Sequence, residues 1–135
     1  MNKLLKGITI ALVIFIFWII NKANKGAPNI FIEFSNSIYY GDKIGHFFIY
    51  GILTLLANLV FKNRSVFWSK NVPLGTVLVS IFVIVEELSQ VFFPRRSLDI
   101  IDLIADALGI LCFTLSGNFL FKKGFLNFKK SSKTK

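Results

Sequence analysis

One stretch decides the fold class of this chain: residues 74–93, which read LGTVLVSIFVIVEELSQVFF. At a rise of about 1.5 Å per residue, a helix of this length covers about 30 Å, the thickness of the hydrocarbon core of a bilayer. Two of its side chains carry a charge, Glu86 and Glu87, and they stand next to each other. The stretch therefore predicts a membrane-spanning helix that holds acidic groups in an apolar setting.

Three further apolar stretches have a similar composition: residues 4–20, 44–61 and 98–121. Hydrophobic residues make up 54% of the chain and charged residues 17%, so it has more apolar surface than a soluble domain of this size can bury. The first stretch offers no small-residue cleavage site, which favours a retained helix over a signal peptide. We predict an all-α, polytopic membrane protein with four transmembrane helices, in a single domain over residues 1–135.

The basic residues predict the orientation of these helices. If all four stretches span the bilayer, eleven of the lysines and arginines fall on one side and five on the other. The side richer in Lys and Arg is usually cytoplasmic. We therefore expect both termini, including a basic tail at residues 122–135, on the cytoplasmic side of a bacterial inner membrane. The net charge of +9 then reflects topology and contact with anionic lipids, and no recognition motif supports nucleic-acid binding.

The polar residues fall into three motifs with helical spacing. They are Asp42, Lys43, His46 and Tyr50; Glu86, Glu87 and Gln90; and Arg96, Asp99, Asp102 and Asp106. Side chains three or four residues apart share one face of a helix. An ionisable side chain within a bilayer costs a few kcal/mol unless it faces protein or water. We therefore predict that the three stripes face inward and line a polar cleft that opens to the outer side, with Arg95 and Arg96 at its lip. Asp42 is also expected to cap its helix.

The order of these motifs resembles the VanZ-like family, small bacterial membrane proteins named for a member linked to teicoplanin resistance. The resemblance covers residues 42 to about 115 and rests on these positions: Asp42, Lys43, His46, Tyr50, Glu87, Gln90, Pro94, Arg96, Asp99, Asp102 and Gly109. Two positions depart from the family pattern, Asp106, where many relatives carry Asn, and Arg95, where a small residue is frequent. The resemblance implies a role at the cell envelope and a link to glycopeptide susceptibility.

Two functions fit such a cleft. In the first, it binds a lipid head group or a cell-wall precursor, with Arg96 making a bidentate contact to phosphate or carboxylate. In the second, the protein is an intramembrane enzyme that acts with or without a bound metal ion. The residues that would serve as metal ligands, or as general acid and base, are His46, Glu87, Asp99 and Asp102. The spacing matches no established metal motif, so the sequence assigns no metal, cofactor or catalytic residue. Membrane lipids and this ligand are the expected partners, and the oligomeric state is left open.

The same polar residues also have structural interpretations. His46 can be a hydrogen-bonding residue that closes the helix bundle, and Glu87 and Arg96 can form a structural ion pair. Tyr50 can be an aromatic residue of the membrane interface. Residues 28–41 are expected to form a loop or a short helix on the outer surface. The concentration of every acidic residue at one side and depth favours a site over structural contacts alone.

Overall fold

The computed structural model describes residues 3–27, 29–67 and 69–123, which are mostly helical. Its elements in chain order are α1 (Lys3–Lys25), α2 (Ile30–Ser37), α3 (Gly41–Val60), β1 (Ser65–Val66), β2 (Ser69–Pro73), α4 (Leu74–Ser89), η1 (Gln90–Phe92) and α5 (Ile100–Lys122). Four helical segments are long and apolar enough to cross a membrane: α1, α3, α4 together with η1, and α5. The prediction of four such helices is confirmed.

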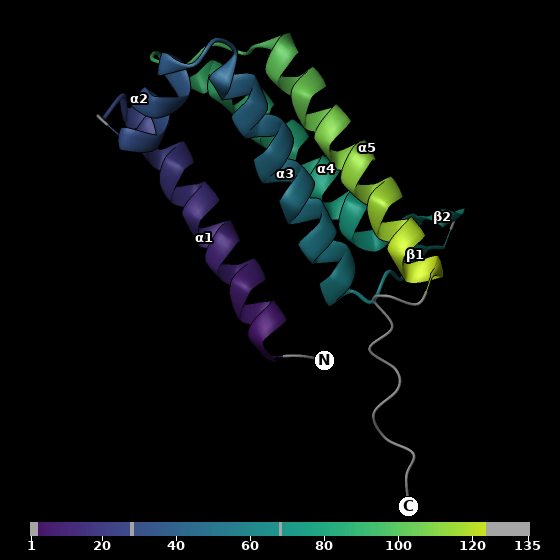
Figure 1. Cartoon of the computed structure of the whole chain (residues 1–135). Coiled ribbons are helices and arrows are strands. Elements are labelled where there is room, and N and C mark those ends of the chain that lie inside the picture. Colours follow the sequence, from purple (N-terminus) through teal and green to yellow (C-terminus); the bar gives the residue numbers. More distant parts are fainter. Residues whose placement is uncertain (1–2, 28, 68, 124–135) are drawn as a thin grey trace, which may run out of the picture.

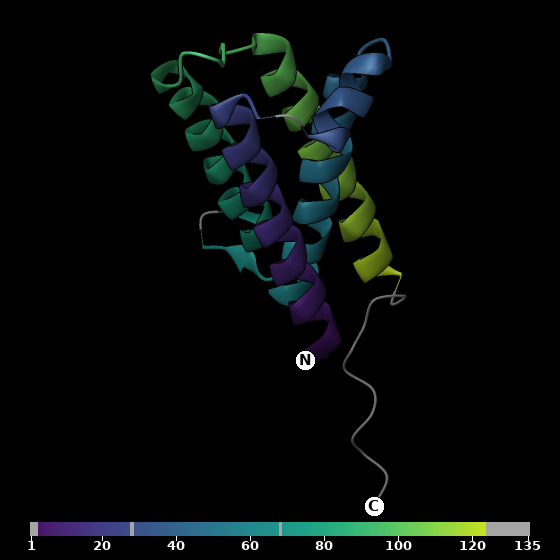
Figure 2. The same cartoon turned by 90° about the vertical axis from the view of Figure 1, so that its left-hand side faces the viewer.

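The four long helices alternate in direction along one bundle. Figure 1 shows the start of α1 and the end of α5 at one end of the bundle, which we call the terminal end. Helix α2 and the segment between η1 and α5 lie at the other end, which we call the α2 end. Helix α1 lies beside α3 and α4 in Figure 2, and Ile16 is the one fully buried residue among its described residues. Helix α1 is therefore the most loosely packed of the four.

Helices α3 and α5 form the closest pair because small residues lie where they cross. A Cβ atom at Gly109 of α5 would collide with the backbone carbonyl of Phe47 on α3. A Cβ atom at Gly51 would collide in the same way with the ring of Phe113. Small residues at such crossings allow two helix backbones to approach closely. The crossing sets the acidic stripe of α5 directly against α3.

Apolar side chains cover the outside of this bundle as well as its core. The core consists of Ile16, Tyr50, Leu53, Ala57, Val79, Val83 and Ile110. Many large apolar side chains point outward instead, among them Ile81, Phe92 and Leu111. Apolar surface that extends around every long helix suits contact with lipid rather than water.

Several helix ends differ from the expected ranges, since α1 runs on to Lys25 and α3 begins at Gly41. Residues 30–37 form the short helix α2, and the side chain of Asn29 caps it by accepting a 2.9 Å hydrogen bond from the amide of Phe31. Helix α5 begins later than expected, because Asp99 is extended and its carboxylate caps the helix by accepting from the amide of Ile101 at 2.8 Å. The hairpin of β1 and β2, which leads into α4, was not predicted, because strands of two and five residues carry little periodic signal.

The expectation that Asp42 caps its helix is wrong. The amide of Gly41 binds the carbonyl oxygen of Ile38, and Tyr40 is the N-cap residue in a left-handed conformation, without a side-chain capping bond. Asp42 therefore lies inside the first turn of α3, where its carboxylate accepts a hydrogen bond from Lys43 instead. At the other end of the chain, the expected basic tail lies outside the described residues beyond Lys123.

Candidate functional site

The first group of polar residues surrounds the ammonium of Lys43 at the α2 end of α3. Its Nζ atom lies 2.6 Å from Asp42 Oδ2, 2.7 Å from Asp99 Oδ2 and 2.7 Å from Asp102 Oδ1. We call these four residues the Lys43 cluster. The side chain of Lys43 is 17% exposed and that of Asp102 is 14% exposed, so this contact is largely shielded from solvent. The hydrogen bond from Lys43 lowers the pKa of Asp99, which precedes α5. The Lys43 cluster joins the starts of α3 and α5.

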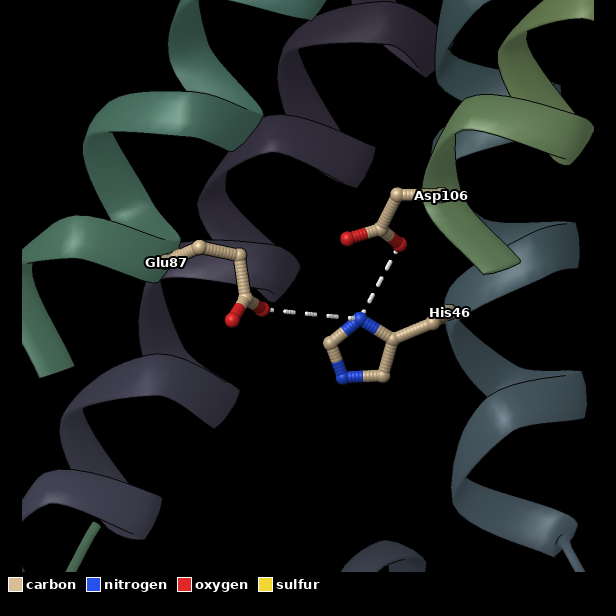
Figure 3. Close-up of side chains that lie close together, drawn as sticks. All are labelled: His46, Glu87 and Asp106. Atoms are coloured by element: carbon tan, nitrogen blue, oxygen red, sulfur yellow. Dashed lines mark hydrogen bonds and ion pairs between the residues drawn. The ribbon is translucent and has the colours of Figure 1, made fainter. Parts of the chain in front are cut away.

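The second group lies one turn further along α3, and we call it the His46 cluster. It consists of His46 on α3, Glu87 on α4 and Asp106 on α5, and Figure 3 shows these three side chains pointing toward one another. The Nδ1 atom of His46 lies 3.0 Å from Asp106 Oδ1 and 4.0 Å from Glu87 Oε1. Asp106 is fully buried, and Glu87 is 2% exposed. Three helices therefore bring two buried carboxylates to one imidazole.

Arg96 forms a third group with Glu86 and Gln90, which we call the Arg96 cluster. The Nη2 atom of the guanidinium lies 3.4 Å from Glu86 Oε1, and Nε donates a hydrogen bond to Gln90 Oε1 at 3.3 Å. The side-chain amide of Gln90 donates in turn to Glu86 at 3.3 Å. The alternative interpretation of Glu87 and Arg96 as a structural ion pair is therefore wrong, because Arg96 pairs with Glu86. Neighbouring residues on a helix point about 100° apart, so Glu86 faces Arg96 while Glu87 faces His46.

A cavity of about 70 Å³ lies where the His46 and Arg96 clusters meet α1. One wall is apolar and consists of Ile16, Ile19 and Ile20 of α1, with Ile49 of α3. The other wall is polar and consists of His46, Tyr50, Glu86 and Arg96. A cavity of this size holds a few water molecules or the end of a polar group, and is smaller than the pockets that enclose whole small molecules.

The structure distributes the eleven candidate residues over these three clusters, with Tyr50 beside them. The ring of Tyr50 lies 5.8 Å from that of His46, and Tyr50 is buried in the core, so its interpretation as an interfacial aromatic residue is wrong. Arg95 is not among the residues that line the cavity; its side chain lies against Gly26, in the turn after α1. The apolar wall on α1 was missed, because isoleucines in a spanning helix give no signal beyond hydropathy.

Fold and site together define a helical bundle with four helices long and apolar enough to cross a membrane and with charged groups buried between them. A model of the VanZ/LLP1 family matches residues 3–121. The chain therefore belongs to the VanZ/LLP1 family, and the resemblance seen in its motifs is confirmed. No curated protein and no solved structure gives a significant match.

Proposed function

We propose that this VanZ/LLP1 protein lies in the bacterial cytoplasmic membrane and binds the anionic head of an envelope lipid or a lipid-linked wall precursor. The observation that carries the proposal is the cavity with one apolar and one polar wall. A lipid has the same division, because its head group ends in phosphate or carboxylate and its chains are apolar. The isoleucines of α1 suit the chain, and Arg96 suits the head group.

The guanidinium of Arg96 has N–H donors that its protein partners do not fully use, and these are available to such a ligand. A guanidinium carries five N–H donors, and the side-chain contacts of Arg96 to Gln90 and Glu86 are long, at 3.3 and 3.4 Å against a typical 2.9 Å. Its planar shape allows two parallel hydrogen bonds to one phosphate or carboxylate. The volume of about 70 Å³ admits the end of a head group rather than a whole lipid. The rest of the ligand would therefore extend along α1 into the surrounding bilayer.

The proposed orientation places the three clusters toward the outer side, where wall precursors are assembled. It rests on the excess of Lys and Arg at the terminal end, to which Lys62, Arg64 and Lys70 contribute. A phosphatase reporter fused after Lys135 should be inactive, whereas one inserted near Pro94 should be active, because the reporter folds only outside the cytoplasm. An active fusion after Lys135 would overturn the outward orientation.

Lipid retention in the purified protein tests the binding itself. The wild-type chain would be reconstituted with phosphatidylglycerol or phosphatidylcholine, and retained lipid would be counted by native mass spectrometry. We expect preferential retention of phosphatidylglycerol by the wild type, because its head group carries a net negative charge. Arg96→Lys should retain less phosphatidylglycerol, because lysine keeps the charge and loses the planar guanidinium that can bind two phosphate oxygens. Arg95→Lys is the matched control, since Arg95 lies outside the cavity lining. Equal retention by both variants and the wild type would contradict a bidentate contact at Arg96.

The His46 cluster supports a second candidate function, an enzyme that acts on an envelope lipid. His46 lines the cavity, and Glu87 and Asp106 stand behind it, so an acid–base pair lies within reach of a bound head group. Lipid profiles of a deletion strain and its parent separate the two functions. A changed lipid or precursor species favours an enzyme, and an unchanged profile favours a binding protein. Growth of the same strains across a teicoplanin series tests the link to glycopeptide susceptibility.

A further inference from the structure

The His46 cluster brings together three side chains of the kinds that bind metal ions. His46, Glu87 and Asp106 each offer one ligand atom, and these atoms lie within 4.8 Å of one another. The three residues come from three helices, α3, α4 and α5, and converge on one point (Figure 3). We propose that His46, Glu87 and Asp106 together bind one divalent metal ion.

The first support is that the carboxylates of this cluster are buried without sufficient partners. Among the described residues, neither side-chain oxygen of Glu87 accepts a hydrogen bond, and Oδ2 of Asp106 accepts none. The side chain of Glu87 is 3% exposed, and that of Asp106 is 0% exposed. Buried polar atoms in proteins are almost always paired, with protein, water or an ion. Three unpartnered acceptor atoms on the two carboxylates beside one imidazole therefore point to a cation bound among these side chains.

The second support is the balance of charge. Arg96 is paired with Glu86, so it does not neutralise Glu87 or Asp106. Lys43 is already in contact with its own three carboxylates. Glu87 and Asp106 thus bring two negative charges that no fixed cation among the described residues contacts, apart from His46 when it is protonated. A divalent ion with a neutral imidazole ligand compensates both charges, and an uncompensated pair would be costly in a low-dielectric interior.

The distances are compatible with a metal ion of ordinary size. A tetrahedral ion with bonds of about 2.1 Å holds its ligand atoms about 3.4 Å apart. The two separations from Nδ1 of His46, 3.0 and 4.0 Å, lie on either side of that value, and all three ligand atoms lie within 4.8 Å of one another. Binding would therefore draw the Glu87 carboxylate toward the other two ligands. One imidazole and two carboxylates suit borderline or hard ions such as Zn²⁺ and Mn²⁺.

Three protein ligands leave at least one coordination position open, as in catalytic zinc sites. Because His46 also lines the cavity, that position is within reach of a head group held by Arg96. This extension rests on the proposed function, whereas the metal site itself does not. A metal ion there would attract a phosphate oxygen from one side while the guanidinium of Arg96 attracts it from the other.

The test is metal binding by the full chain, purified without an affinity tag, treated with chelator and reconstituted in lipid nanodiscs. Zn²⁺ and Mn²⁺ would be supplied separately at equal free concentration, and bound metal would be measured by mass spectrometry. We expect about one ion per chain and a higher melting temperature with the ion than without it. Visible absorption of the Co²⁺-loaded protein would report a site of mixed nitrogen and oxygen ligands.

The variants compare two aspartates that lie one turn apart on α5. Loss of a residue that merely supports a metal ligand costs about 10–100-fold in affinity, so Asp106→Asn and Glu87→Gln should each lose at least that. Asp102→Asn is the matched control, because Asp102 contacts Lys43, and it should bind metal as the wild type does. Metal binding by Asp106→Asn at wild-type affinity would overturn the proposal.

The wild-type protein alone is sufficient to refute the site if the variants do not fold. A wild-type chain that melts cooperatively but binds neither Zn²⁺ nor Mn²⁺ would overturn it. The outcome is separable from that of the proposed function, because retention of phosphatidylglycerol would be measured on the same chelator-treated protein. Retention that depends on Arg96 without any metal would leave the lipid site standing and remove the metal site. Metal binding without a preference for phosphatidylglycerol would support the metal site and contradict the lipid site.

Discussion

The Lys43 and His46 clusters lie one helical turn apart on α3, yet their carboxylates are partnered differently. In the Lys43 cluster, an ammonium lies 2.6 or 2.7 Å from three carboxylates, two of which are appreciably exposed. In the His46 cluster, both carboxylates are buried, and three of their oxygen atoms lack hydrogen-bond partners among the described residues. The first cluster contains its own cation and serves to join two helices. The buried carboxylates of the His46 cluster lower the free energy of unfolding when no ligand is bound, which is typical of a site retained for a ligand.

The crossing of α3 and α5 aligns both clusters, so its disruption should have the largest effect. Gly109→Ala places a methyl group against the backbone of Phe47, which cannot move aside as a side chain can. We expect a loss of about 3 kcal/mol in the free energy of unfolding, near the upper end for overpacked sites. Gly7→Ala in α1 is the control, because no atom lies within 4 Å of its added Cβ. Equal melting temperatures of Gly109→Ala and Gly7→Ala in detergent would show that α3 and α5 can move apart at this crossing without loss of stability.

Replacement of Lys43, whose ammonium is the cation of the Lys43 cluster, should have the next largest effect on stability. Lys43→Met leaves the largely shielded Asp102 without its counter-charge, and breaking a fully buried pair costs about 3–5 kcal/mol. Partial exposure of Asp42 and Asp99 reduces the expected loss to about 2–3 kcal/mol. Lys43→Arg keeps the charge and should retain most of the stability. If thermal unfolding shows Lys43→Met to be as stable as Lys43→Arg, the cluster does not join the two helices.

Replacement of Glu87 should change stability in the opposite direction. In chelator-treated protein, Glu87→Gln removes a buried carboxylate that has no hydrogen-bond partner among the described residues, so the free energy of unfolding should stay equal or rise by about 1 kcal/mol. Added Zn²⁺ should raise the melting temperature of the wild type and not that of the variant. A loss as large as that of Lys43→Met would identify Glu87 as a structural partner and remove the contrast between the clusters.

The smallest expected effect is on how the contribution of the Lys43 cluster to folding stability changes at acid pH. The hydrogen bond from Lys43 lowers the pKa of Asp99 in the folded protein, so this carboxylate stabilises the fold above its unfolded pKa. That contribution is lost as the pH falls through the lowered folded pKa. Asp99→Asn keeps a capping side chain for α5 and removes the charge. Its melting temperature should fall slightly at neutral pH and depend less on pH in the acid range. A pH profile identical to that of the wild type would contradict the contribution of Asp99.

The bundle was predictable because length and hydropathy are properties of each segment alone. Residues 74–93 are apolar over the thickness of a bilayer, and the structure places α4 and η1 there. Spacing was also sufficient to place His46 and Tyr50 on one face of α3, because a helix sets which of its own residues share a face. The short hairpin and the later start of α5 were not predictable, since they depend on a few local hydrogen bonds.

By itself, the sequence determined the family, the helices and the three polar stripes, because these depend on order and periodicity along the chain. Only the tertiary structure decided which stripe residues are partners. Glu86 and Glu87 are adjacent in sequence, yet one contacts Arg96 and the other faces His46, because helix rotation turns them toward different neighbours. Likewise, the tight crossing at Gly109 sets Asp99 and Asp102 against Lys43 and leaves Asp106 facing His46. Partner choice in a low-dielectric interior depends on distances of a few ångströms between helices, and no spacing within one helix encodes those distances.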